Sequence, residues 1–103
     1  MGMTYIEAVM VLCPAAAGGR TTAVEPREGS YRPFVRNAGR LVRVRVIEGP
    51  PRLAPGDAAR VVLESESLLD ADSDLPLIET RAELDHIVGS VTILRVWRGA
   101  IAV

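Results

Sequence analysis

The sequence predicts an all-β domain, a barrel or a sandwich, and two observations support this class. Short segments that are β-branched or alternate between apolar and polar residues recur along the chain. Clusters of glycine and proline separate these segments. A helical alternative exists over residues 79–87, about two turns, where a strand ending in a loop is preferred. The 103 residues suffice for a single domain, spanning residues 1–103, with one core.

The first predicted strand covers residues 4–12, and both of its faces are largely apolar. Alternation alone therefore does not decide whether the even or the odd positions meet the core. The next segment is predicted as a long loop or hairpin arm, because it lacks a helical period and is punctuated by glycine and proline. These positions are Gly18, Gly19, Pro26, Gly29 and Pro33.

Residues 41–47 alternate cleanly and predict a half-buried strand. Arg43 and Arg45 are expected to point to water. The opposite face, which is expected in the core, consists of Val42, Val44 and Val46.

Residues 54–57, Ala-Pro-Gly-Asp, predict a type II turn, because proline and glycine occupy its second and third positions. Further strands are predicted over residues 60–64, 77–80 and 88–96, the last reaching Trp97. Residues 65–76 are predicted as an acidic connection.

Composition excludes several classes of protein. Cys13 and His86 are the only residues of their types, so a disulfide framework or a structural zinc site is not expected. All 12 basic residues are arginines, and the absence of lysine removes the phosphate-binding lysine of a nucleotide loop. No apolar run is long enough to cross a membrane. We therefore expect a cytoplasmic protein without cofactor, metal or membrane partner.

Charge is divided between two blocks of the sequence. The basic block, residues 20–60, holds nine arginines and four acidic residues, a net charge of +5, whereas the acidic block, residues 64–85, holds eight acidic residues and one arginine, a net charge of −7. Such a dipolar chain can orient an encounter with a partner. Arg36, Arg40, Arg43 and Arg45 are candidates for a patch that binds phosphate or an acidic protein surface. The alternative is a solvated strand face, which the scarcity of aromatic residues near the patch favours.

The acidic block contains Asp70, Asp72 and Asp74, which imitate the start of a calcium-binding loop. Leu75 and Arg81 occupy the positions where such a loop needs glycine and glutamate, so a solvated acidic loop is preferred. The same three aspartates are the candidate surface for a basic partner.

Catalysis is not expected. His86 stands beside Asp85 and near Ser90, but the chain has no Gly-x-Ser-x-Gly elbow to present a nucleophile. A small hydrolase around His86 is the least favoured of the functions considered.

An ordered set of short motifs resembles the C-terminal β-barrel, the third domain, of elongation factor Tu and related translational GTPases. Nearly the whole chain is covered. The resemblance implies a six-stranded antiparallel Greek-key barrel. Its motifs are an opening strand ending at Val11-Leu12, Gly18-Gly19-Arg20, Tyr31-Arg32-Pro33, a valine-rich strand, Pro55-Gly56-Asp57 and Val88-Gly89-Ser90-Val91.

The resemblance also implies a role beside RNA, because in the family these loops face the acceptor and T stems of aminoacyl-tRNA. By this resemblance, Arg20 is the one RNA contact that the chain retains. Tyr31 and Arg32 mainly anchor a loop to the barrel, and they are the remaining residues of the candidate binding site.

The chain also departs from the family. The loop over residues 21–30 is longer than the family's and lacks the His-Thr-Pro-Phe that usually follows the arginine. The chain has no GTPase motif, Phe34 replaces a polar residue, and residues 79–85 replace an Arg-Glu-Gly-Gly signature.

Two functional hypotheses follow. The first is a translation-linked, non-catalytic binding module that contacts tRNA or a translation factor through its arginines. The second is a protein-interaction or regulatory module without an RNA role, which binds a basic partner through residues 64–85. Self-association is a further expectation, because edges and apolar faces left without neighbouring domains must be covered or charged.

Overall fold

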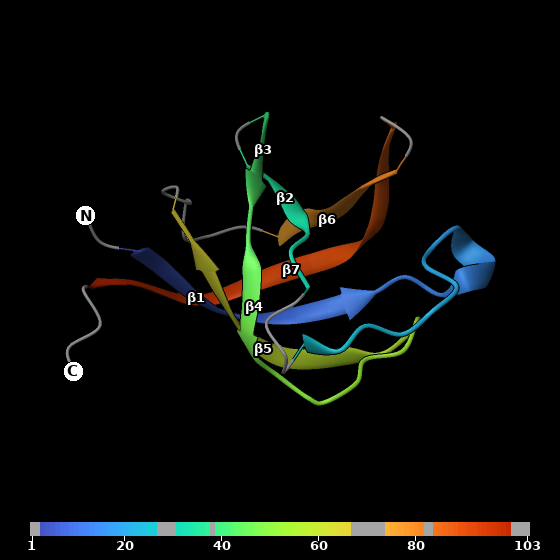
Figure 1. Cartoon of the computed structure of the whole chain (residues 1–103), viewed down its shortest axis with the longest axis horizontal. Helices are drawn as coiled ribbons and strands as arrows, with labels where there is room; N and C mark the ends of the chain where they lie inside the picture. The colour runs from blue at the N-terminus through green and yellow to red at the C-terminus, as the bar shows by residue number, and fades with distance from the viewer. Residues whose placement is uncertain (1–2, 27–30, 38, 67–73, 82–83, 100–103) are drawn as a thin grey trace.

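The structure is a computed structural model that describes residues 3–26, 31–37, 39–66, 74–81 and 84–99. In this part of the chain it is all-β and contains no α-helix, as the sequence predicts. Seven strands form one antiparallel sheet in the order β3-β2-β6-β7-β1-β5-β4, which curls into a half-barrel (Figure 1). The elements are β1 (Met3–Leu12), the 3-10 turn η1 (Ala15–Ala17), β2 (Phe34–Asn37), β3 (Arg40–Arg43), β4 (Arg45–Glu48), β5 (Ala58–Ser65), β6 (Asp74–Arg81) and β7 (Leu84–Gly99).

β1 is a central strand, because β5 pairs with one of its edges and β7 with the other. Its even positions face the core, and Ile6, Ala8, Met10 and Leu12 are 0% exposed. The structure thus decides which of the two apolar faces of this strand is buried. These side chains pack with valines and leucines of the other strands in one hydrophobic cluster.

The predicted strand over residues 41–47 forms, but it is divided between β3 and β4 at Val44. β3 pairs with β2, whereas β4 pairs with β5 at the other end of the sheet order. The Val44 N–H donates to the carbonyl of Pro33 at 3.0 Å, and the Val46 N–H donates to the carbonyl of Tyr31 at 3.2 Å. The three valines are buried as predicted, Arg43 is exposed and Arg45 is half-buried. The change of partner at a single residue contributes to the curl of the sheet.

β2 lies in the segment that was predicted as a loop or hairpin arm. It has four residues, of which only Val35 and Asn37 are buried, so its sequence carries too short an alternation to be recognised. Its register with β3 pairs Phe34 with Arg43 and Asn37 with Arg40. Gly39, at φ 78°, supplies the left-handed backbone conformation next to β3.

β6 and β7 form a longer antiparallel pair than the sequence predicts, with a register from Asp74 opposite Thr92 to Arg81 opposite Leu84. The helical alternative over residues 79–87 is wrong, because the described residues of that segment belong to these two strands. An irregularity in the register between Leu77 and Ile78 leaves both side chains 0% exposed.

The predicted turn at residues 54–57 is present. Gly56 has φ 91°, and the Asp57 N–H donates to the carbonyl of Ala54 at 3.0 Å. The turn packs against the end of β1, since the Gly56 N–H donates to the carbonyl of Leu12 at 2.9 Å. Within the described ranges, none of the helical structure has the length and apolar character needed to traverse a bilayer.

Candidate functional site

Among the described residues, three ion pairs connect the basic block of the sequence with the acidic block. Nitrogen to oxygen distances are 2.5 Å for Arg20 with Glu79, 3.2 Å for Arg45 with Glu64 and 3.9 Å for Arg36 with Asp85. The two blocks therefore fold against each other, and part of the charge separation seen in the sequence is neutralised inside the chain. This pairing limits which charged residues remain available to a partner.

Arg20, Tyr31 and Glu79 form a compact cluster, which we call the clamp. Arg20 Nη1 lies 2.6 and 2.5 Å from the two carboxylate oxygens of Glu79, and the Tyr31 hydroxyl donates to Glu79 Oε2 at 2.6 Å. The Arg20 guanidinium also lies 5.7 Å from the centroid of the Tyr31 ring. The clamp thus joins the segment after η1, the segment before β2 and strand β6. Its ionic side chains are only 18% and 12% exposed.

Replacing Glu79 with glutamine is expected to lower the free energy of unfolding by about 1–2 kcal/mol, because a half-buried guanidinium loses its charged acceptor. Asp85→Asn is the matched control, since its pair with Arg36 is 3.9 Å long and joins side chains that are 45% and 42% exposed. We expect less than about 0.5 kcal/mol for that change. Urea unfolding of both variants gives the comparison, and equal losses would show that the clamp has no special structural role.

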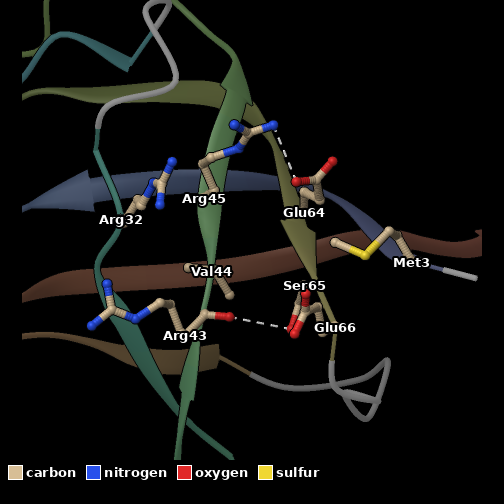
Figure 2. Close-up of a pocket in the computed structure, with 8 residues that line it drawn as sticks. All are labelled: Met3, Arg32, Arg43, Val44, Arg45, Glu64, Ser65 and Glu66. Atoms are coloured by element: carbon tan, nitrogen blue, oxygen red, sulfur yellow. Dashed lines mark hydrogen bonds and ion pairs between the residues drawn. The ribbon is translucent and has the colours of Figure 1, made fainter.

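Two neighbouring cavities share Arg32 and Arg43 in their walls, and the clamp lines one of them. The end cavity, about 360 Å³, lies where β1 begins and β5 ends (Figure 2). The clamp cavity measures about 290 Å³. The end cavity is lined by Met3, Arg32, Arg43, Val44, Arg45, Glu64, Ser65 and Glu66. The clamp cavity is lined by Arg20, Tyr31, Arg32, Pro33, Phe34, Arg43, Glu79 and Thr80.

Arg32 and Arg43 are exposed, and within the described ranges neither forms an ion pair. The Arg43 guanidinium stacks over the ring of Phe34 at 4.5 Å from its centroid. Sequence reasoning missed this role of Phe34. The signal that could have found it is the cross-strand pair between Phe34 and Arg43, which requires the β2 to β3 register.

The structure brings together most of the arginine-rich candidate site, but not all of it. Arg20, Tyr31, Arg32, Arg43 and Arg45 line one or both cavities. Two further candidates do not. Arg36 is directed to Asp85, and Arg40 is the exposed first residue of β3, opposite Asn37.

Of the acidic candidates, Asp74 is the exposed first residue of β6, whereas Asp70 and Asp72 lie outside the described residues. Two other acidic residues of this block, Glu64 and Glu79, form ion pairs with arginines of the same chain.

His86 is exposed and lies opposite Glu79 in the β6 to β7 register. Asp85 accepts a hydrogen bond from the Thr80 hydroxyl at 3.3 Å and faces Arg36. The carboxylate of Asp85 therefore contacts Thr80 and Arg36. In the parts of the chain that are described, no three residues of the His, Cys, Asp and Glu types gather in a way that could hold a metal ion.

No protein-family model matches the chain, and the search of curated proteins finds no relative. The fold and the site define an all-β domain with a curled antiparallel sheet and an arginine-lined pair of cavities at one side.

Proposed function

We propose that the curled sheet is a six-stranded antiparallel Greek-key barrel similar to the C-terminal domain of elongation factor Tu. The order of the sheet begins with β3 and ends with β4, and Val44 alone separates these strands in the chain. Counting residues 40–48 as one strand gives six strands and joins the two ends of the sheet. The bonds from Val44 and Val46 to Pro33 and Tyr31 support this closure.

Two glycines in the motifs of the resemblance support the same proposal. A Cβ atom at Gly19 would stand 2.2 Å from the carbonyl oxygen of Cys13, and one at Gly89 would stand 2.1 Å from the carbonyl oxygen of Val11. Both positions require glycine because another backbone approaches closely. The Gly-Gly-Arg and Val-Gly motifs thus have a physical reason to occur at these two places.

The proposed function is a translation-linked, non-catalytic binding module that contacts the phosphate backbone of tRNA. The observation that carries this proposal is the position of Arg32 and Arg43, two exposed arginines that line both cavities. Arginine recognises phosphate oxygens through paired N–H donors. Stacking on Phe34 orders the Arg43 guanidinium before a partner arrives, which lowers the entropic cost of binding.

The proposal differs from the family resemblance in the residues that meet RNA. The resemblance assigns a contact to Arg20, but this guanidinium is engaged by both carboxylate oxygens of Glu79. We therefore assign Arg20 to the clamp and the phosphate contacts to Arg32 and Arg43.

The test is affinity capture of the tagged protein from a lysate of its host, in halves with and without RNase. We expect tRNA with the wild-type chain, lost after RNase, and at least tenfold less with Arg32→Gln combined with Arg43→Gln. The control is Arg60→Gln, an exposed arginine of β5 that lines neither cavity.

Recovery of one protein regardless of RNase would contradict the RNA proposal. It would favour the second hypothesis, in which residues 64–85 bind a basic protein.

A further inference from the structure

The end cavity has the dimensions of a small-ligand site. Its volume of about 360 Å³ lies at the lower end of the range of pockets that bind small molecules. Met3 contributes an apolar side chain from the start of β1, and Val44 contributes one from the point where β3 passes into β4. The rest of the wall is polar and charged.

One hydrogen-bond donor at this cavity is buried and has no acceptor within the described residues. Arg45 Nε is enclosed, although Nη2 of the same guanidinium lies 3.2 Å from Glu64 Oε1. Buried donors nearly always have a partner, so the Arg45 guanidinium has donor capacity that the described residues do not satisfy.

The cavity presents both signs of charge. Figure 2 shows Arg32 on the side of the segment before β2, and Glu64 and Glu66 on the side of β5. Glu64 is paired with Arg45, whereas Arg32 and Glu66 form no ion pair with any described residue. The Arg43 guanidinium turns away from Glu66 toward Phe34. The two charges left over in this cavity are therefore one guanidinium and one carboxylate.

We propose that the end cavity binds a small zwitterion of the amino-acid class. Its carboxylate is received by Arg32 and the Arg45 guanidinium, its ammonium group by Glu66, and its side chain by Met3 and Val44. A polyanion fits this cavity poorly, because its next phosphate would approach the carboxylate of Glu66. The site shares Arg32 with the proposed RNA contact, but neither proposal requires the other.

The test is a two-dimensional ¹H–¹⁵N NMR titration of the whole chain with each of the common free amino acids in turn, up to about 10 mM. We expect at least one of them to shift the Arg45 Nε–H signal and the backbone amides of residues 64–66 in a saturable way. Its N-acetyl derivative, which lacks the ammonium group, and inorganic phosphate are expected to bind at least tenfold more weakly.

Glu66→Gln is expected to weaken binding of the amino acid at least tenfold, whereas Arg60→Gln is expected to leave the affinity unchanged. An unaltered dispersion of the amide signals shows that each variant is folded. Capture of tRNA by Glu66→Gln stays at the wild-type level, so the two proposals fail separately. The inference is overturned if none of the amino acids shifts the Arg45 Nε–H signal, if the N-acetyl form binds equally well, or if Glu66→Gln binds like the wild type.

Discussion

Replacing Gly89 with alanine is expected to lower the free energy of unfolding by about 3 kcal/mol, the upper end of the usual cost of overpacking. The added Cβ would stand 2.1 Å from the carbonyl oxygen of Val11 and 3.2 Å from the Cα of Leu12. Both neighbours are backbone atoms of β1, so a side-chain rotation cannot relieve the contact. The strands β1 and β7 must move apart, although they are paired from Met3 to Leu12.

Thermal unfolding measures this effect, and for a domain of this size the melting temperature should fall by roughly 10–25 °C. Ser90→Ala is the matched control, because Ser90 is the next residue of β7 and is only half-buried. A Gly89→Ala variant that melts within a few degrees of the Ser90→Ala variant would contradict the close approach of β7 to β1.

Replacing Ile6 with alanine is expected to cost about 2–5 kcal/mol, because it removes buried methyl groups and leaves a cavity. Ile6 is 0% exposed on β1 and lies between Leu63 of β5 and Val96 of β7 in the register. Ile87 is the same residue type on β7 but is 56% exposed, so Ile87→Ala should change stability by less than about 0.5 kcal/mol.

Urea unfolding of the two isoleucine variants tests whether Ile6, at an even position of β1, lies in the core. Similar losses in both would mean that the even positions of β1 do not carry the packing that the structure assigns to them.

Much of the fold could be predicted because local patterns determine it. Alternation over residues 41–47 correctly assigned Val42, Val44 and Val46 to the core, and the Ala-Pro-Gly-Asp sequence correctly predicted a turn at residues 54–57, in which Gly56 has a positive φ. β2 could not be predicted, since four residues offer little periodicity and its stability comes from neighbours far along the chain.

The candidate site was predictable in composition but not in arrangement. Block charges identified the arginines, yet Arg20 and Glu79 are 59 residues apart and meet only after β6 has joined the sheet. The stacking of Arg43 on Phe34 likewise depends on a strand register that the sequence does not display. A charge count cannot distinguish an arginine that is paired inside the chain from one that is free for a partner.

The most direct test of the proposed RNA contact is the salt dependence of tRNA binding to the purified chain. Each phosphate neutralised by an arginine adds about 0.7–0.9 to the slope of log affinity against log salt. The Arg32→Gln and Arg43→Gln double variant should therefore show a slope smaller in magnitude by about 1.4–1.8 than that of the wild type, with Arg60→Gln unchanged. Equal slopes in wild type and double variant, or wild-type binding that does not respond to salt, would contradict the account.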